Sequence, residues 1–402
     1  IKMDRKAFLK QSAALGLGLP FLSLILESCN GEIISQPSFE TNFTGKVLVI
    51  GAGAAGLTAG HILRQNQIDF QIIEAAPVYG GRLKKDTSLA DFPIDLGAEW
   101  IHVEPTVLAD MLNDPEVDAN VEFIHYTPKS IHNYHNGRLK KQNWANNFYA
   151  EYKFKNTTWF GFFEKFIVPN IADKITLNEP VTSINYQGNE VVVQTSNGTT
   201  FTGDKVLITV PITILQDEVI SFTPALSTEK KEAINQVNMG AGLKAFVEFR
   251  ERFYPDILFT GQLLESAFSQ DKIYYDAAFD KDSNKNILGL FTVGEKATQY
   301  TKLSNEEAIL NEILRELDEM FDGQASQNYV QHVIQNWSAE PYIRGSYPDD
   351  FSGNQEDIVD AIKAPIDNKI YFAGEALSID NQSTVHGASE TAYVVMRDIL
   401  QV

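Results

Sequence analysis

The chain contains little cysteine and little positive charge. Cys29 is the one cysteine among 402 residues, so no disulfide can form within the chain, and cysteine usage does not indicate the compartment. There are 33 lysines and arginines against 53 acidic residues, which gives a net charge of −20 at pH 7. This balance disfavours nucleic acids and anionic membrane surfaces as partners. His132 and His135 have no cysteines beside them, so we expect no metal site.

The first 30 residues differ in composition from the rest of the chain. Basic residues within the first ten positions precede an apolar run from Ala13 to Leu26, which suits an export signal better than a membrane span. Residues 4–10 resemble a twin-arginine export motif with one arginine replaced by lysine, and the residues before Cys29 resemble a lipoprotein box. We therefore expect a periplasmic or membrane-anchored lipoprotein, lipidated at Cys29 and followed by a linker over 31–42. A cytoplasmic protein with a packed N-terminal helix is the alternative.

A glycine-rich turn follows a short apolar run in the segment KVLVIGAGAAGLTAG, residues 46–60. Val47 to Ile50 suit a buried parallel strand. Gly51 permits a tight turn, and Gly53 leaves room for the backbone to approach a pyrophosphate. Gly56 allows the following helix to pack closely on the strand. This order of elements predicts a phosphate-binding turn.

The helix after this turn begins at Ala54 and Ala55, and its N-terminal amides would point at the phosphate. A second predicted strand ends at Glu74, 23 residues after Gly51, where a carboxylate can accept both ribose hydroxyls. Together these features predict a dinucleotide-binding domain. The alternative is a strand–helix turn that binds no ligand.

Further motifs in a fixed order connect this turn to one family. They are Gly80-Gly81-Arg82, Asp95-Leu-Gly-Ala-Glu-Trp100, Val181, the run 206–211, Tyr371-Phe-Ala-Gly-Glu375 and Ser383-Thr-Val-His-Gly-Ala388. From about Lys46 to its end the chain resembles the flavin-containing amine oxidases, which include monoamine oxidases, polyamine oxidases and lysine-specific histone demethylases.

The resemblance implies an α/β fold and FAD as a non-covalent cofactor. The expected architecture is an FAD-binding Rossmann-like domain of the glutathione-reductase type with an interleaved α+β substrate domain. We assign 43–105, 173–236 and 363–402 to the FAD domain, and 106–172 and 237–362 to the substrate domain. Ser346 lies at the family's cysteine site, so no covalent flavin link is expected.

The resemblance also implies which residues hold FAD. Glu375 follows a predicted strand over Lys369 to Ala373, and a last helix from about Val385 to Leu400 can direct its N-terminal dipole at the flavin pyrimidine. The complete expected set is Gly51, Gly53, Ala54, Ala55, Gly56, Glu74, Gly81, Arg82, Gly97, Ala98, Glu99, Trp100, Val181, Gly374, Glu375, Thr384 and Val385.

Lys244 is the predicted catalytic residue. Its segment resembles the one in which a family lysine holds a water against flavin N5 and loses its charge readily because the site is dry. Apolar residues alternate at Ala245, Val247 and Phe249, which predicts a strand with one buried face and Lys244 on the other. A solvated strand lysine is the alternative.

Four residues are expected around the substrate. Tyr347 matches one aromatic wall of the family's amine cage, and Thr384 stands where monoamine oxidases have the other, a departure that is similar to polyamine oxidases. Trp337 lies in the stretch leading to this cage, and His102 ends a Trp-Ile-His run found in polyamine oxidases. Core aromatic residues and a structural histidine are the alternatives.

These features predict an FAD-dependent amine oxidase that cleaves a C–N bond of a primary or secondary amine and reduces O2 to H2O2. The amine would be polyamine- or monoamine-like. Two alternatives remain open at this point: a flavin-dependent desaturase or oxidase of C–C bonds, and a non-catalytic tethered flavoprotein. The sequence also predicts a hairpin around Ser196 to Gly198 and helices over Thr228 to Val237 and Asn305 to Phe321, the latter capped by Ser304 and Glu307.

Overall fold

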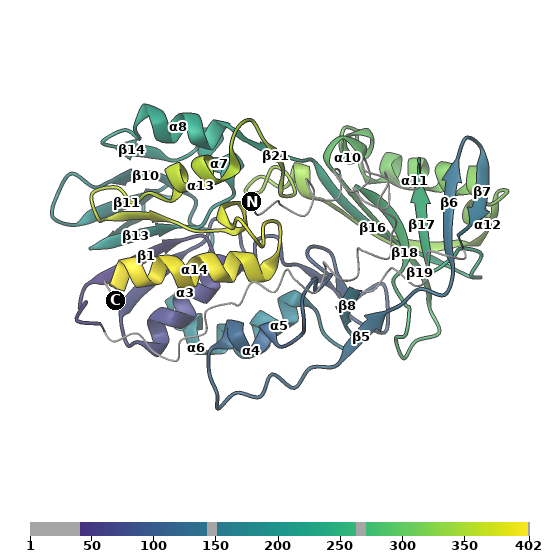
Figure 1. The fold of residues 1–402 in the computed structure, drawn as a ribbon, viewed down its shortest axis with the longest axis horizontal. Coiled ribbons are helices and arrows are strands. Elements are labelled where there is room, and N and C mark those ends of the chain that lie inside the picture. The colour runs from purple at the N-terminus through teal and green to yellow at the C-terminus, as the bar shows by residue number, and fades with distance from the viewer. Residues whose placement is uncertain (1–40, 143–150, 263–270, 401–402) are drawn as a thin grey trace.

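The structure is a computed structural model that describes residues 41–142, 151–262 and 271–400. Figure 1 shows an elongated molecule with a parallel sheet and its helices towards one end, and a larger, mostly antiparallel sheet towards the other. The predicted leader, Cys29 and residues 31–40 of the predicted linker lie outside the described residues. Within the described ranges, no helix is long and apolar enough to cross a membrane.

A five-stranded parallel sheet with the strand order β22-β13-β1-β2-β9 lies between two outer layers. Its strands come from segments far apart in the sequence, because strands of a parallel sheet need crossover connections. All five are short, and β1, β13 and β22 are almost fully buried. The five strands are β1 (Lys46–Ile50), β2 (Asp69–Ile73), β9 (Ile175–Thr176), β13 (Lys205–Ile208) and β22 (Ile370–Phe372).

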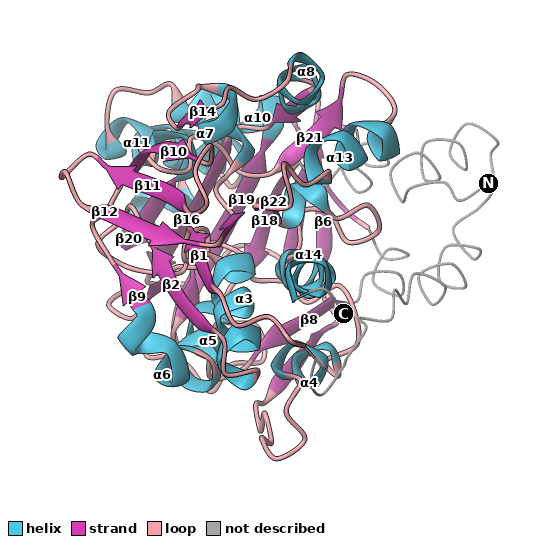
Figure 2. Ribbon diagram, turned by 90° about the vertical axis from the view of Figure 1, so that its left-hand side faces the viewer, coloured by secondary structure: helices cyan, strands magenta, loops and turns pink. Residues whose placement is uncertain are grey.

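Two helices cover one face of this sheet, α3 (Ala54–Gln65) and α14 (Val385–Leu400). Both helices lie beside each other in Figures 1 and 2, and the hydroxyls of Thr58 and Ser389 share a hydrogen bond of 2.9 Å across their contact. Their apolar side chains join the sheet in one core. The final helix has the bounds that the sequence predicted.

A four-stranded sheet and three helices cover the opposite face. β11 (Val191–Thr195) and β12 (Thr200–Gly203) form the predicted hairpin, and β10 (Val181–Asn185) and β14 (Ser221–Thr223) complete the sheet. The helices are α7 (Ile212–Gln216), α8 (Thr228–Asn235) and α13 (Gln355–Lys363). A parallel sheet between a helical layer and a second sheet confirms the predicted α/β class.

The larger sheet has seven strands in the order β20-β16-β19-β18-β17-β6-β7. Three helices pack along one face of this sheet: α10 (Gly294–Thr301), α11 (Glu306–Met320) and α12 (Gln324–Asn328). Their apolar side chains and those of the sheet form a hydrophobic core of their own. The strands are β6 (Ile131–His135), β7 (Arg138–Lys141), β16 (Gly242–Phe249), β17 (Ile257–Thr260), β18 (Lys272–Asp276), β19 (Asn286–Val293) and β20 (Tyr329–Asn336).

Short elements connect the two large sheets. They are β3 (Lys85–Asp86), β4 (Ile94–Asp95), α4 (Val107–Leu112), β5 (Phe123–Tyr126), β8 (Glu151–Phe154), α5 (Trp159–Phe166), α6 (Val168–Ile171), β15 (Val237–Met239) and β21 (Pro348–Phe351). β5 pairs with β8, and Ile101 bridges to Tyr152. These contacts bring β8 against the segment that follows β4.

Two local predictions were wrong. All eight residues of β16 are buried, so Lys244 does not lie on an exposed face, because both faces of this strand are covered. The helix α11 is capped by Asn305, whose side chain accepts the amide of Ala308, and not by Ser304. The domain boundaries stay a prediction.

Candidate active site

The glycine turn forms a narrow cradle between β1 and α3. Gly51 has φ +103°, a conformation that side chains rarely adopt, and a Cβ on Gly56 would lie 2.0 Å from the oxygen of Gly51. The amide of Gly80 donates to the oxygen of Ala52 at 2.8 Å, which places the second glycine pair against the first. A Cβ on Gly53 would meet no atom closer than 4.0 Å, so its side of the turn is open.

The N-terminus of α3 fits a phosphate group. Gly53 is its N-cap and provides no side-chain hydrogen bond, and the first turn, which holds Ala54 and Ala55, has no acidic residue. Helix N-terminal amides with no side-chain cap favour an anion there. The cradle therefore suits the diphosphate of a dinucleotide.

Glu74 lies at the end of β2, as predicted, and is buried. Its carboxylate accepts the amides of Ala52 at 2.6 Å and Ala76 at 2.8 Å. Burial raises the pKa of Glu74 above its ordinary value, and these two backbone amides oppose that shift. The oxygen of Glu74 accepts the amide of Glu179 at 2.9 Å, which brings Val181, at the start of β10, close to the same sheet edge. The predicted adenine and ribose residues are thus neighbours.

Arg82 joins the first and last predicted flavin motifs. Its Nη1 lies 2.6 Å from Oε1 of Glu375, and the same nitrogen donates to the oxygen of Ser346 at 2.5 Å. Gly374, which precedes Glu375, has φ +148° and donates its amide to the hydroxyl of Thr391 on α14. The ion pair between Arg82 and Glu375 therefore holds the Arg82 guanidinium beside the glycine cradle.

Thr384 caps the N-terminus of α14. Its hydroxyl accepts the amide of Gly387 at 2.9 Å and donates to the oxygen of Asn381 at 2.7 Å. Val385, the first residue of the helix, is buried. The hydroxyl of Ser383 donates to the oxygen of Pro348 at 3.4 Å, so the chain beside Thr384 meets the chain beside Tyr347. The structure thus brings both predicted cage positions to one region.

Lys244 is buried and makes three polar contacts. Its Nζ donates to the oxygens of Asp95 at 2.7 Å and Gly97 at 3.1 Å, and lies 2.5 Å from Oε2 of Glu99. Its side chain is 4% exposed, which rules out a solvated lysine. Burial lowers the pKa of Lys244 below its ordinary value, in opposition to the charge of Glu99.

The segment Gly97 to Trp100 connects Lys244 to Arg82. A Cβ on Gly97 would lie 1.7 Å from the oxygen of Arg82, so only glycine permits this approach. Trp337 is buried and donates its indole NH to the oxygen of Leu96 at 2.9 Å. Lys244, Arg82 and Trp337 therefore gather around one short stretch of chain.

Asp95 and Glu99 have opposite pKa shifts in this cluster. Burial, together with the negative charge of Glu99, raises the pKa of Asp95 to about 8. Burial alone would raise the pKa of Glu99, but the ammonium groups of Lys153 and Lys244 lower it to about 2. At neutral pH the cluster thus holds a neutral Asp95 and a charged Glu99.

The remaining predicted substrate residues differ in burial. Tyr347 is half-buried, and burial together with Asp271 and Asp349 raises its pKa. His102 is exposed, and its Nδ1 lies 3.1 Å from Oε2 of Glu151. Among the described residues, no group of three or more histidine, cysteine or acidic side chains could hold a metal ion.

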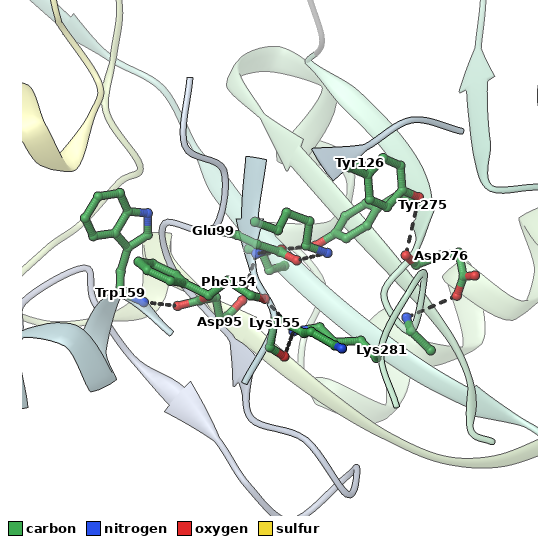
Figure 3. Close-up of polar contacts among 12 residues, drawn as sticks. Asp95, Glu99, Tyr126, Phe154, Lys155, Trp159, Tyr275, Asp276 and Lys281 are labelled. Atoms are coloured by element: carbon green, nitrogen blue, oxygen red, sulfur yellow. Dashed lines mark hydrogen bonds and ion pairs between the residues drawn. The ribbon is translucent and has the colours of Figure 1, made fainter. Parts of the chain in front are cut away.

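Sequence analysis missed three residues of this cluster, Lys153, Tyr126 and Tyr275. Lys153 lies 2.6 Å from Oε1 of Glu99, and the hydroxyl of Tyr275 donates to Oε2 of the same carboxylate. Figure 3 shows Glu99 with Tyr126 and Tyr275 beside it, and Asp95 next to Trp159. The sequence signal for Lys153 is its place between two aromatic residues, Tyr152 and Phe154. That signal does not reveal the contact with Glu99, which depends on the tertiary fold.

Comparisons with known proteins place this site in a family. The profile described as flavin containing amine oxidoreductase matches residues 168–400. The chain belongs to this family. A second profile, an NAD(P)-binding Rossmann-like domain, matches residues 49–115 and covers the glycine cradle. The protein is therefore an FAD-dependent amine oxidase, and its cofactor is FAD.

Curated relatives cover most of the chain at modest identity. Probable polyamine oxidase 4 of Arabidopsis thaliana is 25% identical over 89% of this chain and 87% of its own. Lysine-specific histone demethylase 2 of Homo sapiens is 24% identical over 85% of this chain and 52% of its own. A solved structure of wild-type putrescine oxidase bound to putrescine has a TM-score of 0.72 at 16% identity, covering 90% of this chain and 100% of that one. This last likeness concerns the fold.

Proposed function

We propose that this amine oxidase cleaves a C–N bond of a primary or secondary amine, polyamine- or monoamine-like, with Lys244 beside the reactive edge of the flavin. FAD held by the glycine cradle, Glu74 and Arg82 would supply the redox chemistry: a hydride from the carbon next to the neutral amine would reduce it, and O2 would then take up the two electrons with two protons to give H2O2. The resulting imine takes up water and separates into an aldehyde and either ammonia, from a primary amine, or a smaller amine, from a secondary amine.

The burial of Lys244 carries this proposal. A fully enclosed lysine that contacts Glu99 and lies next to the Arg82 segment has no access to solvent, and its lowered pKa favours loss of its proton. A neutral amine keeps two donors, for Glu99 and the oxygen of Asp95, and gives up the longest of its three contacts, to Gly97 at 3.1 Å, so its lone pair can hold a water that adds to the imine. Glu99 and the oxygen of Asp95 keep the nitrogen in place.

The walls of the substrate site orient the amine. Tyr347 and Thr384 approach each other through Pro348 and Ser383. A ring face attracts an ammonium by about 0.5–2 kcal/mol, but the amine must be neutral to react. Tyr347 therefore orients the substrate more than it binds it. The named polyamine oxidase relative supports a polyamine as the first substrate to test.

Lys244→Met tests the residue assignment. FAD should stay bound, because the cradle, Glu74 and Arg82 are unchanged, while anaerobic flavin reduction or reoxidation slows by at least about tenfold. Lys272→Met is the matched control, because Lys272 is also a buried lysine paired with a carboxylate, Glu316 at 2.7 Å. Unchanged rates in Lys244→Met, measured by stopped-flow absorbance, would remove Lys244 from the mechanism.

A peroxide assay over mono-, di- and polyamines identifies the substrate and the electron acceptor. Peroxide with one amine class supports oxidase chemistry with O2. A flavin that is bleached by an amine but gives no peroxide in air indicates another acceptor. An intact flavin with no bleaching across the panel favours a non-catalytic flavoprotein.

Export of the protein and a lipid anchor at Cys29 are also part of the proposal, and they rest on the N-terminal sequence alone. Cys29→Ser should release the protein from the membrane fraction of a bacterial host if the lipid holds it there. An unchanged distribution between membrane and soluble fractions would contradict lipidation.

A further inference from the structure

Lys153 places a second ammonium on the carboxylate that binds Lys244. The two oxygens of Glu99 are divided between them, with Oε1 2.6 Å from Lys153 and Oε2 2.5 Å from Lys244. Both lysine side chains are 4% exposed and Glu99 is 7% exposed. Water therefore screens this arrangement very little.

Three aromatic rings surround the Lys153 ammonium. Its Nζ lies 4.8 Å from the ring centroid of Trp100, 5.0 Å from that of Tyr275 and 5.4 Å from that of Tyr126. Trp100 meets Tyr126 at 90° and Tyr275 at 62°, so the rings face the cation from different sides. Ring faces attract cations, most strongly where water is excluded.

The cage is held in place from several strands. The hydroxyl of Tyr126 donates to the oxygen of Asp256 at 2.7 Å, and the hydroxyl of Tyr275 donates to Glu99. Lys153 itself is fixed by the pairing of β8 with β5. Figure 3 shows Tyr126 and Tyr275 on the same side of Glu99. These contacts hold the Lys153 ammonium between Glu99 and the three rings.

We propose that Lys153 is a positioning residue for Lys244: its caged ammonium shares Glu99 with Lys244 and so allows Lys244 to give up its proton beside the flavin. A single carboxylate can neutralise one cation. The charges of Glu99 and the Lys153 ammonium cancel, so a neutral Lys244 leaves no net charge on these three groups. The inference rests on the proposed role of Lys244.

Charged and titratable groups face Lys244 from each neighbouring element. Burial lowers its pKa, Glu99 and Asp95 raise it, and Lys153 lowers it. Lys281, which donates to the oxygen of Phe154 at 2.6 Å, interacts electrostatically with Glu99 and Asp95. Removal of the Lys153 charge should therefore raise the pKa of Lys244, while the other groups stay in place.

Two neutral variants and one charged variant test this relationship. Lys153→Gln removes the charge and keeps a donor for Glu99, Lys153→Met removes both, and Lys153→Arg keeps the charge. Lys272→Met is the matched control: Lys272 is buried, pairs with Glu316 at 2.7 Å and lies 5.0 Å from the ring centroid of Tyr300, but it packs against α10 and α11.

The direct measurement is the titration of Lys244 in protein labelled with ¹³C at the lysine ε carbon. Its NMR signal is assigned by its loss in Lys244→Met. We expect the midpoint to rise by about one pH unit or more in the neutral variants, and to stay at the wild-type value in Lys153→Arg and Lys272→Met. A midpoint that does not move in either neutral variant, or that moves equally in Lys272→Met, would overturn the inference.

The pH dependence of anaerobic flavin reduction separates this inference from the proposed function. If neutral Lys244 is the active form, the acidic limb of the rate profile should move to higher pH together with the NMR midpoint. A moved midpoint with an unmoved rate profile supports the coupling of the two lysines and contradicts the proposed role of Lys244. An unmoved midpoint contradicts the coupling and leaves that role intact.

Discussion

Arg82 and Glu375 are 293 positions apart in sequence, yet Nη1 of Arg82 lies 2.6 Å from Oε1 of Glu375. Arg82 follows the second glycine pair, and Glu375 follows the last strand of the parallel sheet. Their contact closes the cofactor region, because it ties the first segment of the sheet to the last. Arg82 also reaches the oxygen of Ser346, next to the substrate residue Tyr347.

Glu375→Gln should weaken FAD binding without unfolding the protein. The amide keeps the shape of the side chain but loses a charge-assisted hydrogen bond, worth about 1.5–3 kcal/mol, which corresponds to a factor of about 10 to 150 in affinity. Glu218→Gln, which alters an exposed pair with Lys231 of the same 2.6 Å length, is the control. FAD fluorescence titration measures both. Equal affinities in the two variants would contradict a role for Glu375 in the cofactor site.

Gly53→Ala and Gly56→Ala should differ in effect. The nearest atom to a Cβ on Gly53 is the oxygen of Gly80, 4.0 Å away, so the fold should be retained in Gly53→Ala. The added methyl group should obstruct the diphosphate and lower the affinity for FAD. A Cβ on Gly56 would lie 2.0 Å from a backbone oxygen, so this variant should lose stability even without FAD. Thermal unfolding of the apoprotein and FAD titration distinguish the two. A Gly53→Ala variant with wild-type FAD affinity would place the phosphate elsewhere.

Tyr347→Ala should lower kcat/KM for the amine by a factor of about 2 to 30, because the amine loses the ring that orients it; this factor is equivalent to about 0.5–2 kcal/mol. Tyr347→Phe keeps the ring and should stay within about twofold of wild type. Steady-state kinetics with the amine identified by the peroxide assay measures the effect. A similar loss in both variants would assign the role to the hydroxyl, and no loss in either would make Tyr347 a packing residue.

Asp95→Asn should change how stability depends on pH. The pKa of Asp95 is raised to about 8, so the folded protein holds a proton that the unfolded chain has already released. This group therefore favours folding most at low pH and loses that contribution as pH rises from about 4 to about 8. Asparagine is neutral at every pH and can still accept the amide of Trp159. The free energy of unfolding of the variant should therefore fall less between about pH 4 and about pH 8 than that of the wild type, by on the order of a few kcal/mol. Chemical unfolding at pH values across this range tests it; parallel curves for the two proteins would contradict a protonated Asp95.

Local patterns in the sequence predicted the elements around the glycine cradle well. The glycine turn, Glu74 at a strand end and the helix from Val385 to Leu400 each depend on short-range geometry, which neighbouring residues determine. Bringing Arg82 and Glu375 together required the family resemblance, because no local pattern reports a contact across most of the chain.

The charged cluster was less predictable. Alternation in β16 indicated one buried face, but the segment around β4 packs on the other, and tertiary contacts override a strand pattern. Lys153 lies in the stretch that departs most from the family, and its partner Glu99 is 54 residues earlier in the chain. Nothing in residues 151–154 alone shows that their lysine is buried.

The position of Lys244 relative to bound FAD is the most direct test of this account. A crystal structure of the FAD-loaded protein should show the diphosphate on the turn from Gly51 to Gly56, and Nζ of Lys244 linked to flavin N5 through one water. A flavin ring bound far from Lys244, with that lysine still enclosed by Glu99 and Asp95, would contradict the account.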